Sequence, residues 1–176
     1  MIRTRVVFAS GALALLAACG SDPPLAPYDL GATSVAARRP FAVAVDPPGA
    51  GPNLDSTRIL VIDHGDSLVL ADAQWPKPLP ALVSERISSA IASPVGAPKV
   101  RLALAIRRFE LIAERRMVLL DLDATVTDAS SRATLRHRDF QTSAFVASTR
   151  PADVTAGFDK AFAALQKRIV VFAYDP

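Results

Sequence analysis

The chain has 176 residues, of which 51% are hydrophobic and 6% aromatic, and it contains one Cys and two His. This length is enough for one domain with its own core, and the apolar fraction excludes a disordered or collagen-like polymer. One Cys cannot close an intramolecular disulfide, and two His cannot complete a three-histidine site. A disulfide scaffold and a His/Cys zinc module are therefore excluded.

Residues 1–18 have the pattern of a secretory signal peptide. Arg3 and Arg5 precede the uncharged run Val6–Leu16, which has 11 residues. That length lies within the about 7–15 residues of a signal-peptide core and is short of the roughly 20 that span a bilayer. The segment ends in Leu16-Ala17-Ala18-Cys19, which resembles the lipobox of bacterial lipoproteins.

The lipobox resemblance implies that Cys19 is the first residue of the mature chain and carries a diacylglyceryl group and an N-acyl chain. Small residues before it suit a peptidase groove, and a thiol is the nucleophile that forms the thioether. Two or more acyl chains anchor a protein stably to a membrane without spanning it. Gly20, in place of an Asp, favours the periplasmic face of the outer membrane. The alternative is ordinary secretory cleavage, with Cys19 in this place by chance.

Without residues 1–18 the chain has 18 basic and 17 acidic residues. A mature chain so close to neutrality does not have the composition of a nucleic-acid-binding protein. Residues 19–27 are predicted to be the lipidated Cys and a Pro-rich tether. The eight residues after Cys19, at about 3.3–3.6 Å each, reach less than roughly 30 Å. We therefore expect one domain, residues 28–176, close to its membrane.

The first half of the domain is rich in strand signals. Residues 41–45 predict a short apolar strand, and Pro47–Asn53 predicts a loop, because proline has no N–H for a strand ladder. Strands predicted at 57–62 and 67–71 flank Asp63-His64-Gly65-Asp66, a segment typical of a hairpin turn.

The rest of the chain has clear periodicity. Apolar residues recur at four-residue steps from 80 to 93, which predicts an amphipathic helix. Alternation at 100–107, 118–127 and 133–145 predicts three antiparallel strands. A longer helix opens at Pro151, where apolar residues recur three or four positions apart. The order of three strands, a helix, three strands and a helix indicates a single α+β domain, with a largely antiparallel sheet and two amphipathic helices on one face.

Several short segments occur in a fixed order along nearly the whole mature chain. They are the lipobox at Cys19, Tyr28–Gly31, Leu54–Ile59, Leu70–Pro76, the helix with Leu82 and Ile87, Leu104–Glu110, the strand to Asp128, and Ile169–Phe172. In order and spacing they resemble the ABC-type transport auxiliary lipoprotein family, whose PqiC-like members are encoded with MCE-domain intermembrane lipid transporters.

The resemblance implies a non-enzymatic docking or adaptor subunit of an ABC/MCE-type system that moves phospholipid or another lipid between membranes. Its partners would be the membrane, through Cys19, and the MCE-domain protein of the transporter, and a homo-oligomer is compatible with the family. No cofactor is implied beyond the lipid on Cys19. Two alternatives stay open: an envelope lipoprotein that regulates or assembles another periplasmic machine, such as a cell-wall synthase or lipopolysaccharide translocon, and a small envelope hydrolase.

Few residues have the pattern of a catalytic or metal site. Neither a G-x-S-x-G elbow nor a Gly-rich phosphate loop occurs in the sequence. The segment Asp63–Asp66 could be a metal half-site, but a hairpin turn needs the same residue types and is favoured. Asp121 and Asp123 share one face of a strand, and we expect that face to be exposed to solvent.

Two further places in the sequence are candidates for contact with a partner or with lipid. Arg136, His137 and Arg138 form a basic stretch on a polar strand, which either contacts lipid phosphate or an acidic partner or blunts an edge strand. Trp75, the only Trp, is either a core anchor or a partner or lipid contact. The pair Lys167–Arg168 lies near the end of the second helix, where basic residues suit the helix dipole.

Overall fold

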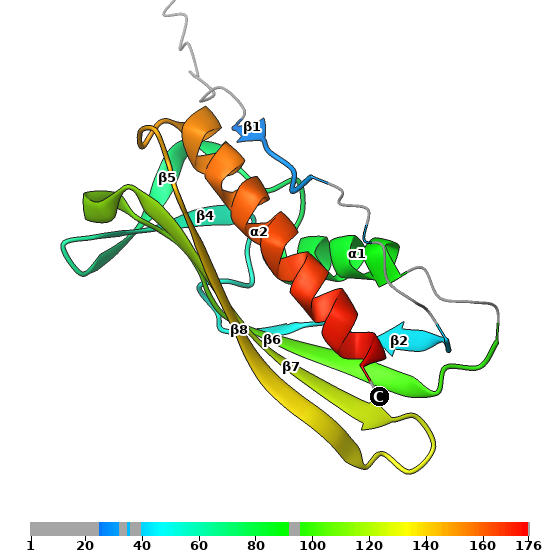
Figure 1. Cartoon of the computed structure of the whole chain (residues 1–176). Coiled ribbons are helices and arrows are strands. Elements are labelled where there is room, and N and C mark those ends of the chain that lie inside the picture. The colour runs from blue at the N-terminus through cyan, green and yellow to red at the C-terminus, as the bar shows by residue number, and fades with distance from the viewer. Residues whose placement is uncertain (1–24, 32–34, 36–39, 92–95, 176) are drawn as a thin grey trace, which may run out of the picture.

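The computed structural model describes residues 25–31, 35, 40–91 and 96–175. Its elements are β1 (Ala26–Pro27), β2 (Val43–Val45), β3 (Gly49–Ala50), β4 (Arg58–Asp63), β5 (Asp66–Gln74), α1 (Leu79–Ile91), β6 (Val100–Ile112), the 3₁₀ turn η1 (Ala113–Arg115), β7 (Met117–Asp128), β8 (Thr134–Phe145) and α2 (Pro151–Tyr174). One curved sheet carries both helices on the same side (Figure 1). The predicted single α+β domain is confirmed.

The sheet has a long antiparallel part and a short parallel part. Its strand order is β1-β5-β4-β6-β7-β8, and β2 and β3 also pair with β6. The antiparallel part is the ladder of β6, β7 and β8 together with the β4–β5 hairpin. On the other edge of β6, the strands β2, β3 and β4 follow one another, and all three run parallel to it.

The parallel strands correct two details of the sequence prediction. The segment Pro47–Asn53 is not wholly a loop, because Gly49 and Ala50 pair with Ala105 and Ile106. Pro47 and Pro48 precede this short strand and Pro52 follows it, so no proline has to donate a ladder hydrogen bond. The strand predicted at residues 41–45 is also shorter, since β2 covers Val43–Val45, and it pairs parallel to β6.

The core lies between the sheet and the helices. Every second residue of β7 from Val118 to Val126 is fully buried, whereas the residues between them are partly exposed. The apolar stripe of α2 packs on this face, and its predicted members are all buried. They are Val154, Phe158, Phe162, Leu165, Ile169 and Phe172. The apolar face of β7 and the apolar stripe of α2 therefore pack against each other, and each element buries one side, as the sequence periods predict.

An aromatic cluster joins three elements at the centre of the core. Trp75, directly after β5, is 1% exposed. Its ring lies edge-on to those of Phe158 and Phe109, with ring centroids 5.4 and 5.8 Å apart. Phe109 of β6 and Phe158 of α2 stack at 5.1 Å. Trp75 is thus a core anchor, and its side chain is not presented to a partner or to lipid, because the aromatic rings cover it.

The two helices are also tied to each other. The side chain of Gln166 donates from Nε2 to the carbonyl of Arg86 at 2.6 Å. The hydroxyl of Tyr174, in the last turn of α2, donates to the carbonyl of Ile91 at the end of α1 at 2.8 Å. These bonds tie α2 to α1, and α2 lies against β7 and β8 of the sheet.

Candidate functional site

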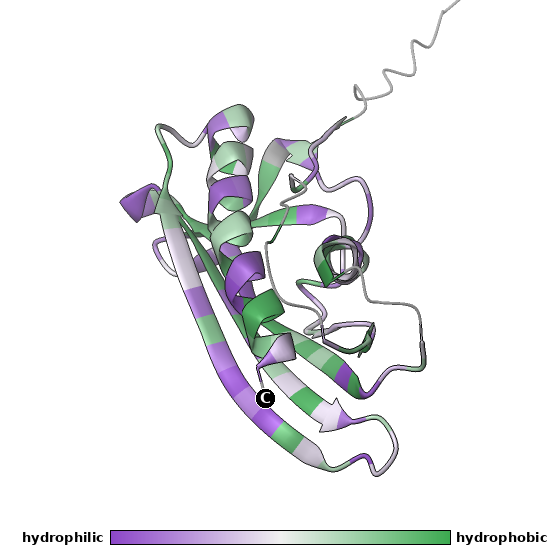
Figure 2. Cartoon of the chain, turned by 45° about the vertical axis from the view of Figure 1, so that its right-hand side comes forward, coloured by the Kyte–Doolittle hydropathy of each residue, from purple (hydrophilic) through white to green (hydrophobic). Residues whose placement is uncertain are grey.

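The basic stretch of β8 is divided between the two faces of the sheet. In the β7–β8 register, Arg136 pairs with Val126 and Arg138 with Ala124, both inward-facing positions, whereas His137 pairs with Thr125 on the outer face. A continuous hydrophilic stretch, Arg136 to Asp139, lies between Leu135 and Phe140 in this strand (Figure 2). Arg136, His137 and Arg138 therefore do not form one cluster, because successive side chains of a strand point to opposite faces.

Arg136 and Arg138 lie against the C-terminal half of α2. Arg136 donates from Nη2 to the carbonyl of Phe172 at 3.2 Å, and so satisfies one of the last carbonyls of the helix. The guanidinium carbons of Arg136 and Arg138 lie 5.6 and 5.1 Å from the centre of the Phe172 ring, within cation–π range. Arg136 is partly buried in this role, and Arg138 is exposed.

On the outer face, His137 belongs to a network of charges. Its Nδ1 lies 3.1 Å from Asp123 Oδ1, and its Nε2 lies 3.8 Å from Asp139. Arg107 of β6 pairs with the same two carboxylates. The hydrogen bond to Asp123 is the main cause that raises the pKa of Arg107 above its ordinary value. The carboxylates on this face are thus already paired with a permanent cation.

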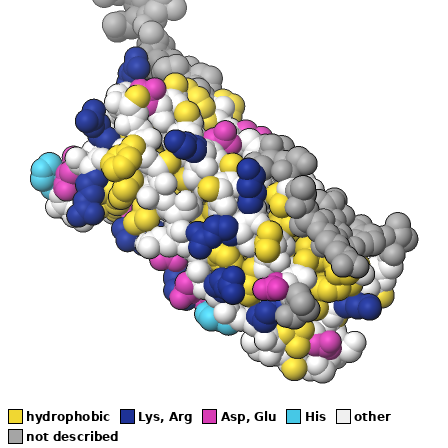
Figure 3. Space-filling model, in the orientation of Figure 1, with side chains coloured by type: hydrophobic (Ala, Val, Ile, Leu, Met, Phe, Trp, Pro, Cys, Tyr) yellow, Lys and Arg dark blue, Asp and Glu magenta, His cyan; other side chains and the backbone are white. Residues whose placement is uncertain are grey.

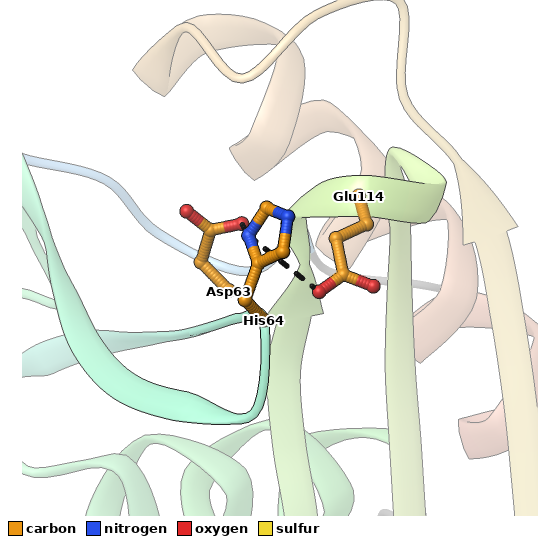
Figure 4. Close-up of side chains that lie close together, drawn as sticks. All are labelled: Asp63, His64 and Glu114. Atoms are coloured by element: carbon orange, nitrogen blue, oxygen red, sulfur yellow. Dashed lines mark hydrogen bonds and ion pairs between the residues drawn. The ribbon is translucent and has the colours of Figure 1, made fainter.

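A second His/carboxylate group lies at the β4–β5 turn (Figure 4). His64 Nδ1 is 3.1 Å from Asp63 Oδ1 and 3.8 Å from Oε1 of Glu114, which comes from η1. Each of the three side chains could offer one ligand atom to a cation, but His64 is 82% exposed. His64 and Gly65 both have positive φ, 49° and 89°, as a tight hairpin turn requires. Turn geometry accounts for these residue types, as the sequence suggested.

The residues of the Phe109-Glu110 segment, which contributed to the family resemblance, lie on opposite faces of β6. Phe109 is in the aromatic core. Glu110 is buried although it lies on the outer face, and its Oε1 accepts a hydrogen bond from Arg108 Nε at 2.7 Å. A buried carboxylate needs such a partner, so the ion pair belongs to the structure of the sheet.

The N-terminal candidate lies outside the described residues. Cys19 belongs to that part of the chain, so its lipidation stays a prediction. The residues after it are partly described, and Ala26 and Pro27 pair with Ala73 and Gln74 as strand β1. The last residues of the predicted tether are therefore part of the sheet.

Sequence reasoning missed the position of Lys167 and Arg168. Both were expected to interact with the helix dipole, but the sheet register and the course of α2 bring them beside Arg138 of β8. The sequence does show the adjacent basic pair on the polar side of an amphipathic helix. It does not show which residues lie beside the pair, because the neighbouring strand is about 30 residues away in the chain.

Comparisons with known proteins agree with the fold. A protein from Xanthomonas campestris, XCC0632, has a crystal structure that matches with a TM-score of 0.75 at 22% identity, over 84% of this chain and 93% of that one. A second crystal structure, of an uncharacterized protein, matches with a TM-score of 0.69 at 10% identity, over 84% and 97% of the two chains. At these identities the likeness shows a shared fold.

Sequence comparisons give a relative and a family. The uncharacterized protein bll6063 of Bradyrhizobium diazoefficiens is 27% identical over 141 residues, which is 73% of this chain but only 38% of that protein. In the described residues, no helix is long and apolar enough to cross a membrane. The family model for the ABC-type transport auxiliary lipoprotein component matches residues 25–170, from β1 through most of α2. On this match the chain belongs to the ABC-type transport auxiliary lipoprotein family.

Proposed function

We propose that the protein is a docking or adaptor subunit of an ABC/MCE-type intermembrane lipid transport system. It is held on the periplasmic face of the outer membrane by lipid on Cys19, and it acts without catalysing a reaction. The observation that carries the proposal is the family match over residues 25–170, which covers almost all of the folded domain.

The exposed apolar side chains support a role in protein contact. Phe145, the last residue of β8, is 79% exposed on the outer face of the sheet, opposite Met117. Leu68 and Val69 are about half exposed on β5. Exposed large apolar residues on strands near the rim of a sheet are typical of partner surfaces. The His/carboxylate groups, by contrast, are exposed or already paired, which favours an adaptor over a hydrolase.

The distance from Cys19 to the fold supports docking at the membrane surface. Strand β1 begins at Ala26, so six residues separate it from Cys19. At about 3.3–3.6 Å per residue, those six residues reach roughly 20 Å. A transporter rooted in the opposite membrane must therefore supply the length that crosses the periplasm, and the lipoprotein receives it.

The experiment tests binding to the MCE assembly separately from attachment to the membrane. A soluble form that lacks residues 1–19 should bind the cognate MCE assembly in a pull-down, yet it should not restore envelope function in cells without the wild-type gene. Full restoration by the soluble form would contradict a docking role at the membrane. Failure of the folded soluble form to bind any MCE assembly would contradict the partner, and would favour a regulator of another envelope machine.

A surface variant makes the pull-down more specific. Phe145→Ser should weaken capture of the MCE assembly and leave the melting temperature within about 2 °C of wild type, because the side chain is mostly exposed. Leu25→Ser, a change of another exposed apolar residue before β1, is the matched control. Equal loss of capture in both variants would show that Phe145 has no particular part in the contact.

The anchor is tested separately. Cys19→Ser should abolish lipidation and leave uncleaved precursor, because a hydroxyl cannot form the thioether on which processing depends. Mass spectrometry of the N-terminus gives the answer directly. The same unmodified mature N-terminus in wild type and variant would show ordinary secretory cleavage instead.

A further inference from the structure

A basic hollow lies at the seam between α2 and the edge strand β8. It has a volume of about 290 Å³ and is lined by Arg138, Phe140, Lys167, Arg168 and Val171. Several Lys and Arg side chains gather over this part of the molecular surface (Figure 3). Three of the five lining residues are cations, and none is an acid.

The two arginines are held by aromatic rings. The guanidinium of Arg138 lies 5.1 Å from the centre of the Phe172 ring, and that of Arg168 lies 5.4 Å from the centre of the Phe140 ring. Arg168 also donates from Nη1 to the carbonyl of Gln141 at 2.8 Å. A guanidinium has five N–H groups, so Arg168 keeps most of its donors for a ligand. Stacking on a ring leaves the N–H groups in the guanidinium plane free, and it reduces the motion lost on binding.

The described residues of the chain do not balance the charge in this hollow. Over the ranges that the structure describes, no carboxylate lies within 4.0 Å of Arg138, Lys167 or Arg168. Arg107, on the other face of the same sheet, pairs with two carboxylates. Three cations around one hollow repel one another, and an anion placed between them removes that repulsion.

The chemistry of the lining favours a phosphate group. Arginine binds phosphate oxygens through two parallel N–H donors, and Lys adds a mobile point charge. Val171 lies on the rim and is 57% exposed, which offers an apolar surface beside the cations. A ligand with both a phosphate and an apolar part fits this combination better than a free inorganic ion.

We propose that the hollow between α2 and β8 binds the phosphate of an anionic phospholipid, through Arg138, Lys167 and Arg168. The site is separate from the anchor at Cys19, and we infer it from the charge and geometry of its lining residues. It goes beyond the docking role, because it gives the folded domain its own contact with a lipid headgroup. The competing structural role is that inward-facing arginines only protect an edge strand from pairing.

The test uses the full lipidated chain in neutral detergent micelles and isothermal titration calorimetry. The probes are dihexanoyl phosphatidylglycerol, dihexanoyl phosphatidylcholine and inorganic phosphate. Phosphatidylglycerol should bind tightest. The choline cation opposes the basic lining, and inorganic phosphate has no apolar part, so both should bind at least about tenfold more weakly.

A charge reversal locates the binding. The side chain of Lys167 is exposed, and no hydrogen bond or ion pair joins it to the described residues, so Lys167→Glu should fold normally. It should weaken phosphatidylglycerol binding about tenfold or more, since an attractive charge becomes a repulsive one. The matched control is Arg115→Glu, an identical exposed charge change in η1, roughly 30 Å away along the sheet. Its affinity should stay within about twofold of wild type.

Several results would overturn the proposal. They are absence of phosphatidylglycerol binding by the wild type, an unchanged affinity in Lys167→Glu, and equal binding of inorganic phosphate and lipid. Equal binding of the two lipids would also overturn it, since the basic lining would then give no preference for an anion. The calorimetry contains no MCE protein, so each of these results would leave the docking proposal untouched.

Discussion

At Gly157, α2 lies close to β7 and to the segment that follows β8. It is buried in the second turn of the helix, and a Cβ built on it would lie less than 3.0 Å from Cγ1 of Val146 and 3.5 Å from both methyl carbons of Val118. Ordinary carbon–carbon contact is about 3.5–4.0 Å. Val146 cannot easily retreat, because its side chain is β-branched and its N–H donates to the carbonyl of Arg116 at 2.8 Å.

The change Gly157→Ala therefore sets two effects against each other. In an exposed helix, replacing Gly by Ala stabilises the fold by about 0.8–1.0 kcal/mol. Forcing an extra carbon into a filled core costs about 1–3 kcal/mol. We expect the second effect to win by up to about 2 kcal/mol. Val146→Ala should remove the obstacle, so that the double variant is more stable than the sum of the single effects by about 1–2 kcal/mol.

Urea denaturation followed by circular dichroism gives the free energy of unfolding of all four proteins in the cycle. Ala164→Gly, at an exposed position of the same helix, is the control and should lose about 1 kcal/mol by helix propensity alone. A Gly157→Ala variant that is more stable than wild type would refute the close approach. So would additivity of the two changes within about 0.5 kcal/mol.

Two other predictions test the core and a turn. Phe162→Ala should cost about 3–5 kcal/mol of unfolding free energy, whereas Val171→Ala on the exposed side of the same helix should change it by less than about 0.5 kcal/mol; similar values would mean that the buried stripe is wrongly assigned. Hydrogen bonds from the backbone and hydroxyl of Ser131 and the backbone of Ser130 hold the pKa of Asp128 below its ordinary value, so this carboxylate stabilises the fold at neutral pH, and that contribution is lost as the pH falls through the lowered pKa. Asp128→Ala should accordingly be less stable than wild type at pH 7 and lose less stability on acidification in a melting series, and parallel curves for the two proteins would contradict this.

Two elements were predicted well, and in both a regular sequence repeat places apolar residues on one buried side. The α2 stripe and the β7 alternation are each long enough for the period to be unambiguous, and the structure buries their apolar residues in full. Pro151 also begins α2 as predicted, because a proline in the first turn has no N–H to satisfy. Periodicity of this kind is a local property, which a single chain shows without knowledge of its partners.

The parallel strands could not be predicted in the same way. β2 and β3 have three and two residues, too few for a period, and their pairing with β6 joins segments more than 50 residues apart. The sequence around them, Pro47 to Asn53, is rich in turn residues and favours a loop. The strand at β2 was predicted, but its parallel partner was not; Gly49 and Ala50 become a strand because the edge of β6 that β7 leaves open pairs with them.

The same limit explains why the sequence could not place the basic residues relative to one another. Along the sequence, Arg136, His137 and Arg138 are one stretch, but the pleat separates them into two electrostatic settings. On the outer face Arg107, Asp123 and Asp139 neutralise one another around His137. On the helix side Arg138 meets Lys167 and Arg168, and the described residues place no acid in the lining, since the facing side of α2 adds cations instead of carboxylates. Charge that a protein balances internally supports the fold, whereas charge that it leaves unbalanced beside a hollow is available to a ligand. This difference appears only when strand register and helix position are both known, and it makes the α2–β8 seam, and not the His/carboxylate groups, the surface most suited to an anionic ligand.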